Sequence, residues 1–248
     1  MPSASVPLRS EGLPVFDSVL GLTADLIAAL AGPLGSAAPA IVLFTVAVRL
    51  LLLPLSVMQA RGERVRRRLA PRVRKLKDRH GRDPERLRRE LAALYAGENA
   101  SPVAGCLPGL AQLPFFTVMY QVFVSSTIAG QANVLLTHGL FGVPLGQQFA
   151  GTVAGFGLIS GPSLVFAGLF LLLLAVAAIT SRRIRRTMAE GDQEVQPEVL
   201  RRLMPLLPFG TLLAAAVLPL AAGIYLLVTT AWTAGERAVL HRSTLSPA

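Results

Sequence analysis

The sequence has few charged residues over most of its length, and it has a single cysteine. Only 15% of its 248 residues are charged, and none of the 83 residues from position 99 to position 181 is Asp, Glu, Lys or Arg. The surface of a soluble globule needs more charge than this, so the composition indicates an integral membrane protein. Cys106 is the lone cysteine, which excludes an internal disulfide.

Recognisable catalytic and cofactor-binding motifs are missing as well. The three histidines, His80, His138 and His241, are scattered and have no partners at metal-ligand spacing. The sequence contains no phosphate-binding loop, no zinc spacing and no Gly-x-Ser-x-Gly turn. We therefore expect no enzyme activity, no cofactor and no metal site.

The positive charge that is present is concentrated in one short segment. The net charge is +10, and residues 61–89 hold 14 of the 24 Lys and Arg residues. Such a segment can attract ribosomal RNA, anionic lipid headgroups or an acidic protein. Charge alone does not distinguish these partners.

Several apolar stretches are long enough to cross a bilayer, because a spanning helix needs about 20 mostly apolar residues. The uncharged stretch 203–234 is too long for one crossing and contains Pro219 near its middle, which predicts two spans joined by a tight turn. The predicted spans lie near residues 38–60, 103–124, 163–180, 203–217 and 218–236.

The distribution of basic residues supports five spans and not four. Lys and Arg accumulate in cytoplasmic loops, and five spans with an outside N-terminus place all the basic clusters in the cytoplasm. With four spans, Arg237 and Arg242 would lie outside. The fold class we predict is an all-α integral membrane protein with a five-helix transmembrane core.

The segments outside the membrane are predicted from their apolar spacing. Residues 1–37 form an outer N-terminal segment, in which an amphipathic helix lies on the membrane interface; a sixth span is the alternative. Residues 99–248 form the rest of the core, with a basic cytoplasmic C-terminus. Its outer loop, 125–162, is neutral and has no clear helical period.

Residues 61–98 predict a basic helical hairpin in the cytoplasm. Apolar residues recur at helical spacing on both sides of the sequence Gly81-Arg82-Asp83-Pro84, where Asp83 can cap a second helix that begins at Pro84. The hairpin is interpreted either as a solvated helix pair that only fixes topology, or as a docking arm for a ribosome, a targeting factor or the membrane surface. The residues predicted to carry recruitment are Arg66, Arg67, Arg68, Arg72, Arg74, Lys75 and Lys77.

Arg49 is the only charged residue between positions 38 and 60, and it lies near the middle of that predicted span. A charge at bilayer depth costs roughly 2.5–3.5 kcal/mol on insertion-derived scales, and it usually faces a protein interior or a water-filled cavity. On a straight helix Thr45, Arg49, Leu52 and Ser56 share one face, which is then mostly polar. We therefore predict that Arg49 looks into a hydrated cavity.

The sequence offers Arg49 no obvious counter-ion. The nearest acidic residues to the predicted spans are Glu98 and Glu236, which lie at span ends. We expect both to be too shallow to pair with Arg49 easily. A buried ion pair is therefore the less favoured interpretation of Arg49.

Further polar residues are predicted to surround the same cavity. Gln112 lies between Pro108 and Pro114, two prolines that leave backbone carbonyls for protein or water to satisfy. The last span adds a tyrosine, a tryptophan and three threonines. Ordinary hydrogen bonding between helices is the alternative for Gln112 and the threonines. The predicted groove residues are Arg49, Thr45, Ser56, Gln112, Tyr225 and Thr230.

These motifs together resemble a known family. The sequence AVRLLLLPL at 47–55, the basic hairpin, and NASPVAGCLP at 99–108 followed by Gln112 and Pro114 are similar to the YidC-type membrane protein insertases of the YidC/Oxa/Alb family. The resemblance covers roughly residues 38–240. It is closest to short members that lack the large outer domain.

The resemblance implies a five-helix core with a groove that opens to the cytoplasm and sideways to lipid. The arginine matching Arg49 would attract polar or acidic segments of nascent membrane proteins, the tyrosine matching Tyr225 would lie near the substrate, and apolar client helices would pass into lipid. The implied partners are nascent membrane proteins, anionic lipids, and a ribosome, signal recognition components or the Sec translocation channel, with no DNA. The implied location is the bacterial plasma membrane, with the N-terminus outside and the C-terminus in the cytoplasm.

The sequence departs from the family pattern at several positions. Two extra residues separate Asn99 from Pro102, and Leu226 and Thr230 stand where an aromatic residue and an asparagine are usual. These changes suggest a specialised paralogue with a narrower range of clients. Two rival functions remain: a small anion channel or carrier with Arg49 as its selectivity charge, and a membrane anchor whose only active part is the hairpin.

Overall fold

The computed structural model describes residues 14–98, 113–128, 131–190 and 198–242. Helices dominate these residues, which confirms the prediction of an all-α protein. The helices are α1 (Pro14–Leu34), α2 (Ala37–Leu51), α3 (Leu53–His80), α4 (Pro84–Gly97), α6 (Leu113–Val124), α7 (Phe149–Phe156), α8 (Gly161–Glu190), α9 (Glu198–Leu203), α10 (Gly210–Val217) and α11 (Leu220–Arg242). Short elements are the 3-10 helices η1 (Val134–Thr137) and η2 (Leu207–Phe209) and the strands β1 (Thr127–Ile128), β2 (Gln131–Ala132), β3 (Gly139–Leu140) and β4 (Val143–Pro144).

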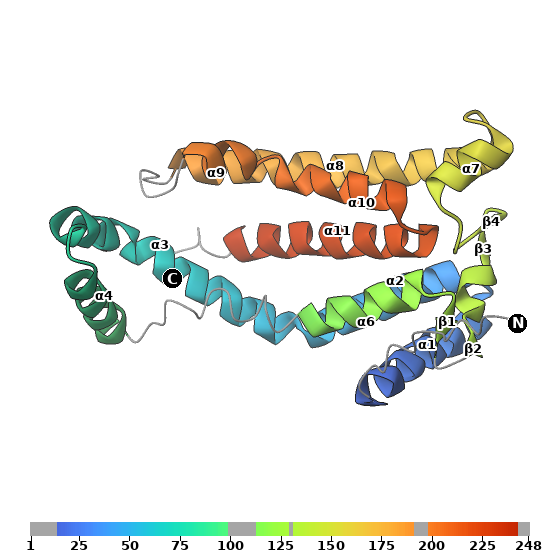
Figure 1. Cartoon of the computed structure of the whole chain (residues 1–248), viewed down its shortest axis with the longest axis horizontal. Coiled ribbons are helices and arrows are strands. Elements are labelled where there is room, and N and C mark those ends of the chain that lie inside the picture. Colours follow the sequence, from blue (N-terminus) through green and yellow to red (C-terminus); the bar gives the residue numbers. More distant parts are fainter. Residues whose placement is uncertain (1–13, 99–112, 129–130, 191–197, 243–248) are drawn as a thin grey trace, which may run out of the picture.

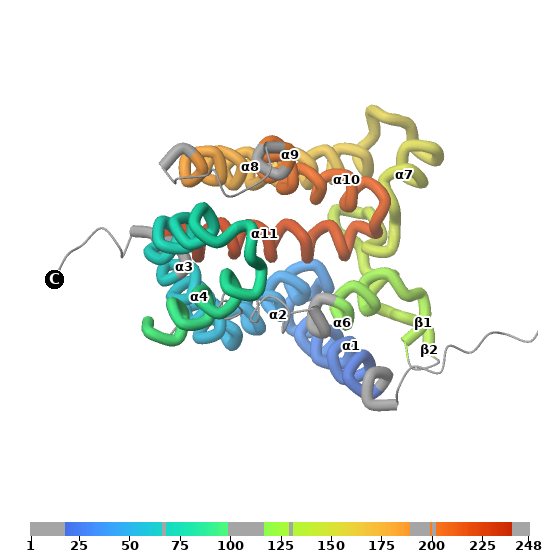
Figure 2. Tube along the Cα trace, turned by 60° about the vertical axis from the view of Figure 1, so that its left-hand side comes forward, coloured from blue at the N-terminus to red at the C-terminus, as the bar shows by residue number. Residues whose placement is uncertain are grey.

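Helix α11 is the centre of the arrangement. It packs against α2 on one side and α8 on the other, and Figures 1 and 2 both show it between them. Helix α1 packs against α2 and α6, and α6 also contacts α11. The hairpin of α3 and α4 projects at the end opposite the strands (Figure 1). The core between these helices includes Ile41, Phe123, Phe166, Leu173 and Tyr225, all of which are buried.

Among the described residues, one helix is long and apolar enough to cross a membrane. It is the Gly161–Met188 part of α8, and a second span is counted if α2 and the Leu53–Val65 part of α3 act as one bent unit. Part of the predicted span 103–124 lies outside the described residues. Helix α10 is short, and α11 carries three threonines and the charged pair Glu236-Arg237. The five-helix transmembrane core therefore stays a prediction.

The first predicted span, 38–60, is not the straight helix that we expected. Helix α2 ends at Leu51, α3 begins at Leu53, and the two axes meet at 54°. Pro54 explains the break, because it has no N–H to donate to the carbonyl of Leu50 and its ring crowds the preceding turn. Beyond the bend, α3 continues without interruption into the basic segment.

The basic hairpin has the predicted turn. The Asp83 side chain accepts a hydrogen bond from the backbone N–H of Arg86 at 3.0 Å, and Pro84 opens α4. Gly81 is required in the turn, because an added Cβ would lie 2.6 Å from the carbonyl oxygen of Lys77. Helices α3 and α4 are in contact, and Leu69 of α3 is buried. The capped turn between two helices is therefore as predicted, and the cytoplasmic position of the hairpin stays a prediction.

The predicted loop 125–162 contains more structure than its sequence suggested. Helix α7 lies within it, although the sequence there has no clear helical period. Phe149 explains this helix, because its ring packs on Phe166 and Phe170 of α8 with centroids 5.7 Å and 5.1 Å away. The spacing of apolar residues in a sequence does not reveal tertiary contacts of this kind.

This loop also holds the N-terminus of α11. The first N–H groups of a helix have no partners within the helix. Here the N–H of Leu220 donates to the carbonyl of Gln147 and that of Ala221 to the carbonyl of Leu145, both at 2.9 Å. The start of α11 is therefore fixed by the segment that follows β4.

Helix α1 coincides with the predicted amphipathic segment. It packs against α2 and α6, and Ile27 and Ala31 are its most buried apolar residues. Its Ser18–Leu34 part is apolar but short. Its position on a membrane interface stays a prediction.

Candidate functional site

Arg49 lies in the last turn of α2, just before the bend at Leu52. A cation at this end of a helix interacts favourably with the helix dipole. The side chain is half-buried beside α11. Within the part of the chain that the structure describes, no hydrogen bond or ion pair joins the Arg49 guanidinium to another side chain.

One face of α11 is polar and is turned toward Arg49. Tyr225, Thr229, Trp232 and Glu236 follow at intervals of four, three and four residues, which places them along one side of the helix. Arg49 interacts electrostatically with both Tyr225 and Glu236, so this side of α11 faces the guanidinium. The arginine thus lies opposite a polar strip that runs along much of α11.

Two polar atoms of this strip are buried without a hydrogen-bond partner among the described residues. They are Trp232 Nε1 and Glu236 Oε1. Leaving a buried donor or acceptor unsatisfied costs about 1–3 kcal/mol, so folded proteins rarely keep several together without water or a ligand to bond them. The strip is therefore suited to contact with polar material and not to close apolar packing.

The structure brings together Arg49 and Tyr225 of the predicted groove residues. Thr45 is fully buried, and its hydroxyl donates to the carbonyl of Ile41 at 2.7 Å. The Thr230 hydroxyl donates to the carbonyl of Leu226 at 2.7 Å, and residue 230 lies on a different side of α11 from Tyr225. Both hydroxyls are thus satisfied within their own helices.

Ser56 and Gln112 are the two remaining predicted groove residues. Ser56 is half-buried on α3, beyond the bend, so it does not continue the α2 face of Arg49 as a straight helix would require. Gln112 lies outside the described residues. Their part in a groove stays a prediction.

Glu236 was not predicted to belong to the site. We expected it to be too shallow for Arg49, but the structure places its carboxylate within electrostatic range of the guanidinium. Its spacing from Tyr225 along an unbroken helix was the available signal. That spacing also identifies Thr229 and Trp232 as members of the same strip.

Contacts with α8 hold α11 in this orientation at two levels. Near its start, Gly223 allows Leu169 of α8 to approach closely, because an added Cβ would lie 2.6 Å from Leu169 Cδ2. Farther along α11, Arg183 of α8 donates from Nη1 to the carbonyl of Ala234 at 2.7 Å. The polar strip is therefore carried by a helix that contacts α8 at both of these levels.

The opposite side of α11 borders an apolar cavity of about 420 Å³. The cavity lies between α11 and α8 and is covered in part by the tip of the β3–β4 hairpin. Helix α11 thus carries the polar strip on one side and borders the apolar cavity on the other. The cavity is lined by Leu140, Phe141, Leu164, Val165, Gly168, Leu169, Leu172, Leu220, Ile224 and Leu227.

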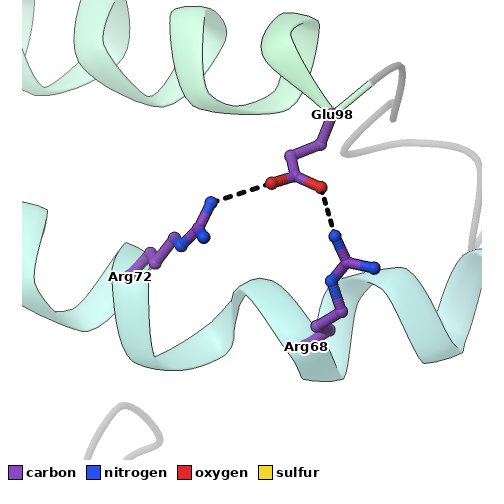
Figure 3. A network of polar contacts seen from close by, with 3 residues as sticks. All are labelled: Arg68, Arg72 and Glu98. Carbon is purple, nitrogen blue, oxygen red and sulfur yellow. Dashed lines mark hydrogen bonds and ion pairs between the residues drawn. The ribbon is translucent and has the colours of Figure 1, made fainter.

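Most of the basic side chains described in the hairpin are exposed to solvent. Glu98, just after α4, accepts from Arg68 at 2.6 Å and from Arg72 at 2.8 Å, which joins the two helices (Figure 3). The two arginine side chains nevertheless remain 75% and 62% exposed. Lys75 and Lys77 are exposed and Arg74 is half-buried, while the side chains of Arg66 and Arg67 lie outside the described part.

A bundle of apolar helices that keeps an arginine and unsatisfied polar atoms between two of its helices belongs to the class of helical membrane proteins with an internal polar site. Comparison with known proteins agrees with this class. The chain belongs to the 60Kd inner membrane protein family, because the model of that family matches residues 29–246.

Its relatives include proteins named membrane protein insertase YidC. The Streptomyces avermitilis protein is 27% identical over 220 residues, which cover 84% of this chain and 51% of the relative. The Mycobacterium leprae protein is 30% identical over 245 residues, covering 86% and 64%. The Mycolicibacterium paratuberculosis protein is 29% identical over 245 residues, covering 86% and 69%. The chain thus spans about half to two thirds of the length of these relatives.

The comparisons confirm the predicted resemblance to the YidC-type family. None of the three relatives is named as a channel or carrier, so the rival interpretation of Arg49 as a selectivity charge receives no support.

Proposed function

We propose that this protein inserts membrane proteins into the bacterial plasma membrane by receiving their polar segments in a hydrated groove between α2 and α11. The observation that carries the proposal is the Arg49 guanidinium, which has no ion-pair partner within the described residues and faces the polar strip of α11. The names of the relatives support the same activity. The groove would contain Arg49 and Tyr225, with Thr229, Trp232 and Glu236 added to the predicted set.

The magnitudes suit a transient contact. Moving one charged residue into the bilayer costs roughly 2.5–3.5 kcal/mol on insertion-derived scales. A client carboxylate 4 Å from the guanidinium gains about 4 kcal/mol at an effective dielectric constant of 20. The gain offsets the cost without exceeding it greatly, so an acidic segment is attracted and can still leave.

The apolar side of α11 supports a route for release. The cavity between α8 and α11 is lined only by apolar residues and glycine, and Leu164 and Leu172 at its edge are exposed. A client helix that passes this surface into lipid gains about 0.8 kcal/mol for each CH₂ that it buries. Burial of the client's own apolar residues therefore drives the step, and no nucleotide is required.

The basic hairpin is proposed to recruit clients or their carriers. The exposed guanidinium groups of Arg68 and Arg72 support a docking arm over a helix pair that only fixes topology. A ribosome, signal recognition components, the Sec translocation channel and anionic lipids all fit a basic surface of this kind. The proposed orientation places the hairpin and the C-terminus in the cytoplasm and the N-terminus outside, with five spans.

The test of this function is client insertion by purified protein in vesicles. Arg49→Ala should reduce insertion of clients with acidic outer segments, and Arg49→Lys should retain much of it because the charge is kept. Arg186→Ala, which removes an exposed arginine at the end of α8, is the matched control and should insert normally. Equal insertion by the wild type, Arg49→Ala and Arg49→Lys would remove Arg49 from the mechanism.

A further inference from the structure

Glu236 places a negative charge on the same strip of α11 that faces Arg49. Its Oε1 atom is buried and has no hydrogen-bond partner among the described residues. It interacts electrostatically with Arg49, yet no ion pair within 4.0 Å joins the two side chains. The carboxylate is thus close enough to attract the guanidinium but does not occupy its hydrogen-bond donors.

Two other arginines lie near Glu236 in the described residues, and neither forms an ion pair with its carboxylate. Arg183 reaches the same part of α11, but its Nη1 atom donates to the carbonyl of Ala234. Arg237 is adjacent in sequence and exposed, and consecutive helical residues point in different directions. Arg49 is therefore the cation with which we pair the charge of Glu236.

We propose that Glu236 is an internal competitor that sets how much negative charge a client must carry to be held by Arg49. This inference rests on the proposed function, since it concerns the selectivity of the same site. In the absence of a client, Glu236 balances part of the charge of Arg49. A client carboxylate must therefore bind Arg49 against the repulsion of the nearby Glu236 carboxylate.

The separation of Glu236 from Arg49 lets a client carboxylate bind the guanidinium without displacing Glu236. Attraction between charges rises as their separation falls, and hydrogen bonds to a guanidinium form only at contact distance. A client carboxylate that reaches the Arg49 donors, which bond to no side chain within the described residues, therefore interacts more strongly than Glu236 does from its longer range. Weakly polar segments gain no such contact and would be held less well. Glu236 would thus raise the threshold for binding without closing the site.

The experiment measures the client concentration that gives half-maximal insertion. Vesicles carrying the full chain would receive a model client with one Asp in its translocated segment, and a matched client with Asn instead. Glu236→Gln keeps the shape of the side chain and removes its charge. We expect it to lower the client concentration for half-maximal insertion by about threefold or more for the Asp client and to leave the Asn client unchanged. Asp25→Asn, at an exposed position of α1, is the control for loss of one negative charge and should match the wild type.

Further variants separate charge from shape. Glu236→Asp keeps the charge and should behave as the wild type. Combined with Arg49→Gln, Glu236→Gln should have no effect, because the competition needs both partners. Overturning results are an unchanged or raised half-maximal concentration for the Asp client, an equal shift for the Asn client, or an Asp variant that behaves like the Gln variant.

Failure of this inference is distinct from failure of the proposed function. If Arg49→Ala lowers insertion and Glu236→Gln has no effect, Arg49 acts without a competitor and only the inference is wrong. If Arg49→Ala itself has no effect, the proposed groove mechanism is wrong.

Discussion

Gly223 of α11 lies directly against Leu169 of α8, so closely that a Cβ at position 223 would be 2.6 Å from Leu169 Cδ2. Because the same helix carries Tyr225 and the rest of the polar strip, this contact fixes which side of α11 faces Arg49. The function of the strip therefore depends on a glycine that carries no chemistry.

Substitution of Gly223 should destabilise the α8–α11 pair. Overpacking costs about 1–3 kcal/mol, and we expect a cost in this range for Val. Ala should cost less, because the atom that its Cβ meets is a terminal methyl of Leu169, which borders the cavity and can turn away. Thermal unfolding in detergent would measure the loss. Gly235→Ala is the matched control, since nothing lies within 4 Å of its added Cβ, and helix propensity alone should stabilise that variant by up to about 1 kcal/mol. If Gly223→Val is as stable as Gly235→Ala, the close approach does not constrain the helix pair.

Glu98 should control the angle of the hairpin more than its stability. It joins α4 to Arg68 and Arg72 of α3, but ion pairs with exposed arginines contribute only about 0.2–1 kcal/mol each. Glu98→Gln should therefore leave the unfolding temperature nearly unchanged and increase hydrogen exchange in α4.

The control for Glu98 is Glu85→Gln. Glu85 pairs with Arg89 at 3.9 Å within α4 and does not join the two helices through that pair. Its hydrogen exchange should stay close to that of the wild type. Exchange that rises equally in both variants would show that loss of a local charge, and not loss of the link between helices, loosens α4.

A larger side chain should fit into the apolar cavity. Once the cavity is filled, the release of clients into lipid should be slower. Gly168 lines the cavity, and nothing lies within 4 Å of an added Cβ there. Gly168→Leu should keep the stability of the protein but slow insertion of clients with long apolar helices. Ala175→Leu adds the same bulk at an exposed position of α8 away from the cavity, and it should insert normally. Equal insertion rates for the two variants would show that the cavity takes no part in client release.

Local signals in the sequence predicted local structure well. Asp83 and Pro84 occupy their expected cap positions, because a helix start is decided by a few neighbouring residues. Helix α7 was missed because Phe149 and its partners on α8 are distant in sequence. The strip facing Arg49 was found only in part: Tyr225 was predicted as a polar residue of the last span, whereas Glu236 was judged by its depth along a span. Which residues of α11 face α2 depends on how α8 holds α11, and that relationship is not visible in either sequence segment alone.

Replacement of Pro54 should straighten the junction between α2 and α3. The bend of 54° follows the loss of one helical hydrogen bond, since Leu50 has no N–H partner at position 54. Pro54→Ala restores that donor, and a proline inside a helix costs about 3 kcal/mol, so a continuous helix becomes the more stable form. The hairpin would then move relative to Arg49. Distances between spin labels on α2 and α3 would report the change, with Pro71→Ala, inside α3, as the control that should leave the bend intact. A bend that persists in Pro54→Ala would show that packing of α2 against α1 and α11, and not the proline, determines the direction in which the basic arm leaves the bundle.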